Sequence, residues 1–322
     1  MQCFHPVLVR EWIDTPDGRR KKSNSFRYVP CGKCVACLQA RRSQWTYRLC
    51  QEADRSVLSY FVTFTYDDEH LLNNMFQYKN VVFPCFNKRD VQLYVKRLRK
   101  RLSMFNSDIR VSYLIVSEYG SKTFRPHYHG LFFFKGCHVS EDQTIQELIT
   151  DCWTQSSNYP VIQPTCQANI HYVTKYSLKD ISGVFSEIKY FDNGGKTIGF
   201  SEKANTYLER PFMLCSTRPY LGSSIELDLE THIMQNGSDC TGVYLQGRPM
   251  SMPRILRQKA GVVGKPIEES PEPRLNLEQY KGYQYMYSRL HVQEDFDTWL
   301  NNKLNQREQR ALEVAARKSE KV

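Results

Sequence analysis

The sequence of 322 residues lacks any apolar run that approaches the roughly 18 residues of a membrane span. Its first ten residues include His5, Pro6 and Arg10 in place of the apolar centre of a signal peptide. There is no internal repeat and no Gly-x-x-x-x-Gly-Lys motif that would cradle nucleotide phosphates. We therefore expect a globular protein of a reducing cytoplasm, with no membrane partner and no fused helicase.

Acidic residues are outnumbered, with 34 Asp and Glu against 44 Lys and Arg, which gives a net charge of +10. The chain also has 20 Tyr and 17 Phe. A positive field combined with many flat π surfaces is typical of proteins that bind single-stranded nucleic acid. An anionic membrane surface or an acidic protein would be attracted as well, so composition favours nucleic acid without excluding these partners.

Cysteines are present in an odd number, eleven, in a chain without a signal peptide. This pattern favours free thiols and metal binding over disulfides. Cys31, Cys34 and Cys37 are separated by two residues each in a glycine-containing turn, and thiolates at this spacing can close on one tetrahedral ion. We expect a structural Zn²⁺ with Cys3 or Cys50 as the fourth ligand; the alternative is a set of free thiols in a turn.

Residues 125–134, Arg-Pro-His-Tyr-His-Gly-Leu-Phe-Phe-Phe, have the composition of a buried strand. Side chains alternate along a strand, so His127 and His129 point to the same face. Burial and mutual repulsion keep two adjacent imidazoles neutral, with lone pairs available to a metal. The alternative is a pair of half-buried histidines that have hydrogen-bond partners.

A second strand, over residues 111–118, precedes the histidine strand, and Gly120-Ser121-Lys122 forms the turn between them. In such a hairpin Glu118 approaches His127 and His129. One carboxylate and two imidazoles leave open positions on a divalent ion. The addition of Glu118 favours the metal site over the two structural histidines.

Residues 170–179 have the pattern of a helix in which Tyr172 and Tyr176 share one face. Lys175 and Lys179 each lie three residues beyond a tyrosine. A phenol has a pKa of about 10, and a neighbouring ammonium favours the phenolate and can neutralise charge on a phosphate under attack. We expect one tyrosine to attack a phosphodiester and form a 5′-phosphotyrosine and a free 3′-hydroxyl. The alternative is an amphipathic helix with core tyrosines.

A further helix is predicted after Asn87, a suitable N-cap, with apolar residues at helical spacing from Val91 to Leu102. Its other face is densely cationic, and such density is costly unless anions screen it. We expect these residues to contact DNA phosphates: Lys96, Arg97, Arg99, Lys100 and Arg101.

The order of these motifs resembles that of HUH-type rolling-circle replication initiators. The Cys-Gly-Lys-Cys-Val-Ala-Cys segment, followed by Leu38, Arg41, Trp45 and Arg48, is similar to the initiation proteins of gokushoviruses in the Microviridae. The resemblance covers residues 30 to 180. It implies an endonuclease that nicks single-stranded origin DNA of a small phage in the cytoplasm of its bacterial host, stays linked through tyrosine, and rejoins the strand after synthesis by host helicase and DNA polymerase.

The resemblance also implies residue roles and a fold. It assigns His127, His129 and Glu118 to a catalytic Mg²⁺ or Mn²⁺, and Tyr172 and Tyr176 to a two-tyrosine mechanism, without indicating which attacks first. The expected fold class is α+β, an antiparallel sheet of about five strands flanked by helices with a ferredoxin- or RRM-like core. A mainly helical C-terminal extension is expected from the sequence pattern after Leu275.

Four segments are expected: a Cys-rich segment with its helix (1–56), the endonuclease core (57–185), an accessory region (186–265) and a helical tail (266–322). Two other functions fit parts of the sequence. A non-catalytic, basic, zinc-containing DNA-binding protein would explain the charge and the cysteines. A metal-dependent phosphodiesterase that activates water would cleave DNA without a covalent adduct.

Overall fold

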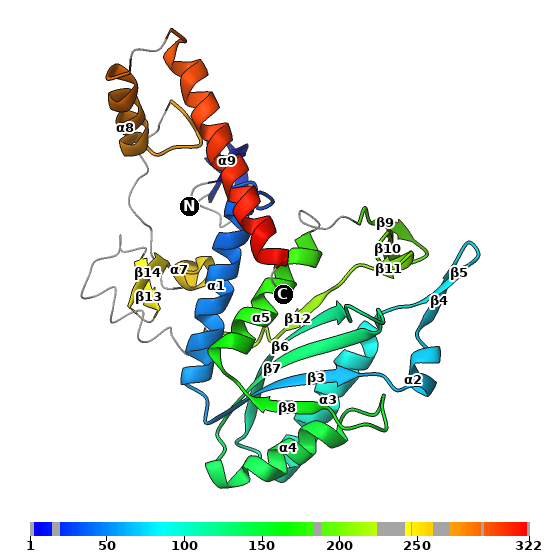
Figure 1. Ribbon diagram of the computed structural model, residues 1–322. Coiled ribbons are helices and arrows are strands. Elements are labelled where there is room, and N and C mark those ends of the chain that lie inside the picture. Colours follow the sequence, from blue (N-terminus) through cyan, green and yellow to red (C-terminus); the bar gives the residue numbers. More distant parts are fainter. Residues whose placement is uncertain are drawn as a thin grey trace. The chain divides into compact units, whose positions relative to one another are not determined.

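The computed structural model describes residues 3–14, 20–182, 188–223, 242–245, 247–259, 271–290 and 293–320 (Figure 1). It describes only the backbone of residues 11–14, 20, 176–182, 242, 248, 249, 251, 259 and 318–320. The chain divides into two compact units, one formed by residues 1–41 with 264–322 and the other by residues 42–263. The boundaries expected from the sequence for the four segments remain a prediction.

The larger unit is built on a five-stranded antiparallel sheet with the strand order β12-β6-β7-β3-β8. The two central strands, β7 and β3, are predicted correctly from their aromatic and β-branched residues, which suit a pleated, half-buried surface. The strands of this sheet are β3 (Leu58–Thr65), β6 (Arg110–Tyr119), β7 (Pro126–Lys135), β8 (Val161–Pro164) and β12 (Met213–Cys215).

Helices cover both faces of this sheet (Figure 1). On one face, α3 (Lys88–Phe105) and α4 (Asp142–Asp151) bury their apolar sides against Tyr60, Val62 and Phe132. On the other, α5 (Gln167–Ser182) and the second half of α1 (Val35–Asp54) pack on Leu131 and Phe133. Because successive residues of β7 alternate between these two cores, His127 and His129 belong to the α5 face.

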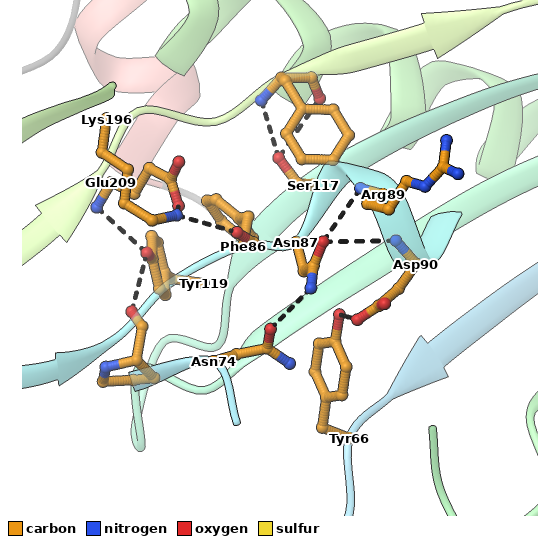
Figure 2. A network of polar contacts seen from close by, with 12 residues as sticks. Tyr66, Asn74, Phe86, Asn87, Arg89, Asp90, Ser117, Tyr119, Lys196 and Glu209 are labelled. Atoms are coloured by element: carbon orange, nitrogen blue, oxygen red, sulfur yellow. Dashed lines mark hydrogen bonds and ion pairs between the residues drawn. The ribbon is translucent and has the colours of Figure 1, made fainter. Parts of the chain in front are cut away.

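Helix α3 begins where the sequence predicts. The side chain of Asn87 accepts hydrogen bonds from the backbone N–H groups of Arg89 and Asp90, which satisfies two of the unpaired donors at the helix start. Figure 2 shows that the amide of Asn87 also donates to Oδ1 of Asn74 at 2.9 Å. The start of α3 is thereby tied to the chain that precedes strand β4 (Met75–Tyr78).

The same network holds the two neighbours of Glu118 in β6 (Figure 2). The hydroxyl of Ser117 accepts a hydrogen bond from the N–H of Phe212 at 2.7 Å. The hydroxyl of Tyr119 donates to the carbonyl of Pro84 and accepts from the N–H of Glu209, each at 3.1 Å. Because alternate residues of a strand face opposite ways, fixing Ser117 and Tyr119 on the α3 face directs Glu118 to the α5 face.

Smaller elements complete the larger unit. A hairpin of β4 and β5 packs against a three-stranded sheet through Phe83, Cys85 and Ile198. These and the remaining elements are α2 (Asp68–Leu72), β5 (Val81–Pro84), the 3-10 helix η1 (Val139–Glu141), β9 (Phe191–Asn193), β10 (Lys196–Ser201), β11 (Thr206–Glu209), β13 (Gly242–Leu245), β14 (Arg248–Ser251) and α7 (Arg254–Lys259).

The other unit combines a hairpin of β1 (Val7–Asp14) and β2 (Arg20–Val29) with two C-terminal helices, α8 (Leu277–Ser288) and α9 (Phe296–Glu320). Trp299, Leu300 and Leu304 of α9 form a small core with tyrosines of α8. The predicted α+β class, the five-stranded antiparallel sheet and the helical C-terminal region are confirmed. Among the described residues, no helix is both long and apolar enough to cross a bilayer.

Candidate functional site

The three predicted metal ligands lie on the α5 face of the sheet. In the register of β6 with β7, Glu118 is directly opposite His127, and His129 is opposite Val116. Directly opposed residues share a face, with Cβ atoms about 4.5–5.5 Å apart, and His129 is two residues along the same strand. The backbone therefore holds both imidazoles and the carboxylate together, as the hairpin argument predicts.

His129 is buried and firmly oriented. Its ring stacks on Phe61 with centroids 5.6 Å apart, and Nδ1 lies 3.1 Å from the hydroxyl of Thr63. This arrangement points Nε2 at Glu118, whose Oε2 is 3.2 Å away. A hydrogen bond to one ring nitrogen fixes the role of the other, so His129 is prepared to present Nε2 as a ligand.

His127 is held by close packing. Its Nδ1 is buried with no hydrogen-bond partner among the described residues. Burial lowers the pKa of His127, and the proximity of His129 lowers it further, so the ring is neutral at neutral pH. A Cβ on Gly120 would lie 2.9 Å from Nε2 of His127, which explains why glycine occupies this turn.

This donor set can hold a divalent ion, although the three side chains are not yet gathered around one point. Among the residues that the structure describes, only the four N-terminal cysteines place their ligand atoms all within 4.8 Å of one another. The unpartnered nitrogen of His127 can join the pair formed by His129 and Glu118 if its ring turns. Two imidazoles with one carboxylate suit Mn²⁺ or Zn²⁺ better than Mg²⁺, which prefers oxygen ligands.

Tyr172 joins this group from α5. Its hydroxyl donates a hydrogen bond of 2.9 Å to Oε2 of Glu118. Its ring meets His129 edge-on with centroids 5.2 Å apart. A phenol, a carboxylate and an imidazole thus converge from a helix and two strands.

The rest of the doubled Tyr-x-x-Lys pattern is on the same helix, as predicted. Lys175 is half-buried, one turn beyond Tyr172. Tyr176 and Lys179 also belong to α5, but their side chains lie outside the described residues. Their roles remain predictions.

The cationic face of α3 belongs to the opposite side of the sheet from His129. Arg97 donates two hydrogen bonds to the carbonyl of Cys152, and Arg101 forms an ion pair with Asp151 at 3.2 Å. The guanidinium of Arg99 lies over the ring of Tyr113. Three of the five predicted DNA contacts therefore also bind groups within the protein, while Lys96 and Lys100 are exposed.

The cysteine cluster forms a second candidate metal site. The Sγ atoms of Cys3 and Cys34 are 3.8 Å apart, and those of Cys31 and Cys37 are 4.0 Å apart. Zinc–sulfur bonds of about 2.3 Å at tetrahedral angles separate sulfur atoms by about 3.8 Å, so the four thiols match a Zn²⁺ site. Cys50, the other candidate ligand, is buried in the core under α1.

Hydrogen bonds within the cluster favour a thiolate. Burial by itself would raise the pKa of the Cys31 thiol, but the N–H groups of Cys34 and Lys33 both point at its sulfur and lower the pKa to about 6. A thiolate is the form that binds metal. The four cysteines could therefore bind Zn²⁺.

Two supporting residues were not found by sequence reasoning. Phe61 and Thr63 contact His129, and both lie on β3, opposite the histidine strand. The signal was present, because Phe61, Thr63 and Thr65 are the alternate residues of a correctly predicted strand. What the sequence did not contain was the pairing of that strand with β7.

Comparisons with known proteins confirm the resemblance found in the sequence. The profile of a family of replication-associated proteins, the ORF2 family, matches residues 59–181. The chain is 39% identical over 106 residues to the "Replication-associated protein ORF2" of Spiroplasma virus 4, a match that covers 33% of this chain and 31% of that protein. It is 30% identical over 199 residues to the "Replication-associated protein VP4" of Bdellovibrio phage phiMH2K, covering 56% and 59%.

A further relative is the "Replication-associated protein ORF4" of Chlamydia phage 1, 26% identical over 164 residues, or 47% of this chain and 38% of that protein. The matches thus span between about a third and three fifths of these relatives. Among solved structures, the N-terminal nuclease domain of the Minute virus of mice non-structural protein-1 matches with a TM-score of 0.21 and 10% identity, over 58% of this chain and 83% of that domain.

Proposed function

Because residues 59–181 belong to the replication-associated protein ORF2 family, we propose that this protein nicks single-stranded DNA at a replication origin with a tyrosine nucleophile. One observation carries the proposal. The hydroxyl of Tyr172 is bonded to Glu118 at 2.9 Å, and the same carboxylate oxygen lies 3.2 Å from Nε2 of His129. A nucleophile, a proton acceptor and metal-binding nitrogens are thus within contact of one another.

The reaction is an in-line displacement at phosphorus. The Tyr172 hydroxyl loses its proton, for which Oε2 of Glu118 is an acceptor within hydrogen-bond distance. The phenolate oxygen forms a bond to the phosphorus while the bond from phosphorus to the 3′ oxygen breaks, and that oxygen takes up a proton. The products are a 5′-phosphotyrosine and a free 3′-hydroxyl. Attack of a 3′-hydroxyl on the phosphotyrosine reverses the step and rejoins the strand.

His127, His129 and Glu118 would hold the divalent ion, Mg²⁺ or Mn²⁺. When bound, the ion supplies Lewis-acid stabilisation of the charge that develops on the phosphate. The protein's own residues orient the reactants. Phe61 and Thr63 fix the ring of His129, and the bonds of Ser117 and Tyr119 direct Glu118 toward Tyr172.

The other predicted residues extend this function. Lys175 and Lys179 would neutralise the phosphate under attack, and Tyr176 would serve as the second nucleophile in rejoining. The exposed Lys96 and Lys100, with their arginine neighbours on α3, would contact backbone phosphates. Host helicase and DNA polymerase would carry out synthesis from the free 3′-hydroxyl in the cytoplasm of a bacterium that the phage infects.

A non-catalytic zinc-containing DNA-binding protein is the second candidate, and the four-cysteine cluster favours it. A phosphodiesterase that uses activated water is the third. Incubation with labelled single-stranded DNA from the replicon and Mn²⁺ separates all three. A covalent protein–DNA adduct supports the tyrosine mechanism, cleavage without an adduct supports activated water, and binding without cleavage supports the non-catalytic protein.

A further inference from the structure

Helix α9 carries a stripe of cations on one face. Lys303, Arg307, Arg310 and Arg317 are separated by four, three and seven residues. At about 100° per residue, they fall within an arc of about 80° on the helix surface. The stripe runs for about 21 Å along the axis, at about 1.5 Å per residue.

The first three cations border a hollow of about 280 Å³ between α8 and α9, together with Tyr283 and Gln306. No acidic residue is among the described residues that line it. None of the ion pairs found among the described residues involves Lys303, Arg307 or Arg310. The adjacent acid, Glu308, is bonded instead to Nε2 of His5 at 2.7 Å.

This arrangement is unfavourable without an anion. Like charges one helical turn apart repel each other, and here three follow in succession. A polyanion with regularly spaced charges removes that repulsion and releases its own counterions on binding. The hollow also offers π surfaces, since Tyr283 lines it and the ammonium of Lys303 lies 5.8 Å from the ring of Trp299. Cations interleaved with aromatic rings are the chemistry by which proteins follow a nucleic-acid strand.

We infer that this hollow, the α9 groove (Tyr283, Lys303, Gln306, Arg307 and Arg310), is a second DNA-binding site that grips the phosphate backbone. The identity of its ligand rests on the proposed function, but its residues take no part in the cutting chemistry. Single-stranded and duplex DNA both present phosphates to it. Binding measured with each form shows which of them the groove takes.

The test measures the affinity of the full chain for 30-nucleotide single-stranded and duplex DNA by fluorescence anisotropy over a range of salt concentrations. The variant is Lys303→Gln/Arg307→Gln/Arg310→Gln. Glutamine is a good helix former, so α9 is retained, which circular dichroism verifies. Each lost phosphate contact lowers the salt slope of log K by about 0.7 for single strands and about 0.9 for duplex. We expect the slope to fall by about 2 for the form that the groove binds.

Two matched variants complete the design. Lys189→Gln/Lys203→Gln/Lys281→Gln removes the same charge from exposed positions outside the groove and should leave the slope within about 0.5 of the original. Lys303→Arg/Arg307→Lys/Arg310→Lys keeps the charge and should keep the affinity. Equal losses in the groove variant and the charge-matched control would overturn the inference. So would a groove variant that loses binding to vesicles of anionic phospholipid while its DNA affinity is unchanged.

Nicking distinguishes this inference from the proposed function. The groove variant should nick a short oligonucleotide as fast as the original protein at saturating concentration. If the unaltered chain forms no adduct, the proposed function fails, while the salt slopes still decide whether the α9 groove binds DNA.

Discussion

The hydroxyl of Tyr172 donates a hydrogen bond to Oε2 of Glu118, the carboxylate oxygen that also lies 3.2 Å from Nε2 of His129. The two residues are 54 positions apart in the sequence, on α5 and β6. The carboxylate has two functions in this position. It orients the phenol toward the histidines, and it is a proton acceptor that is already in contact with the nucleophile.

Removing either histidine should remove nicking while single-strand affinity stays within about twofold, because cations and aromatic rings supply most of that affinity. His127→Ala and His129→Ala should also weaken Mn²⁺ binding by at least about tenfold, measured by titration calorimetry. His171→Ala is the matched control, since that side chain is exposed on α5. Normal nicking by both variants would show that the metal assignment is wrong.

Gly120→Ala tests the close approach at His127. The added methyl group would lie 2.9 Å from Nε2, so the imidazole must move. We expect Mn²⁺ affinity and the nicking rate to fall at least about fivefold, while the free energy of unfolding changes by less than about 1 kcal/mol. Gly282→Ala is the control, because a Cβ there meets nothing within 4 Å and alanine favours the helix by up to about 1 kcal/mol. Unchanged Mn²⁺ binding in Gly120→Ala would contradict this account of His127.

The cysteine cluster should hold one Zn²⁺ per chain, measured by metal analysis of the purified protein. Cys31→Ser should release it and lower the melting temperature, because binding to a structural zinc site stabilises the fold around it. Cys50→Ser should keep the full zinc content, since Cys50 packs with Leu49 and Leu114 in a different core. Equal zinc loss in both variants would argue against the four-cysteine site.

Glu52 provides a test of stability. Its buried carboxylate forms an ion pair with Lys135 at 2.7 Å and accepts hydrogen bonds from Ser112 and from the N–H of Gly222. Glu52→Gln leaves the lysine without its counter-charge, and we expect a loss of roughly 2 to 3 kcal/mol in the free energy of unfolding, less than for a fully buried pair because Lys135 is partly exposed. Glu147→Gln, at an exposed position of α4, should change it by less than about 0.5 kcal/mol. Denaturant titration measures both values.

Much of the site could be predicted from local patterns. Alternation along one strand placed His127 and His129 on a common face, and helical spacing placed Tyr172 on a helix. These predictions depend only on the periods of strand and helix. The bond between Tyr172 and Glu118 could not be predicted, because it depends on how α5 packs on the sheet.

Other features required contacts through space. Strand β12 has three residues, Met213–Cys215, too few to show alternation, so its place beside β6 was not predicted. The choice between Cys3 and Cys50 as the fourth thiol depends on where the N-terminus folds back. The cations of α3 were expected to face solvent, yet Arg97 finds the carbonyl of Cys152, a partner 55 residues away.

The most direct test of the central claim is the identity of the residue that becomes joined to DNA. The protein is incubated with Mn²⁺ and 3′-labelled oligonucleotides that tile the replicon encoding it, and the labelled peptide is mapped by mass spectrometry. We predict a 5′-phosphotyrosine at Tyr172 and a loss of adduct on the order of 10³-fold or more in Tyr172→Phe, with no change in Tyr159→Phe, an exposed control. Cleaved DNA with unmodified protein, or first attachment at any other residue, would contradict the account.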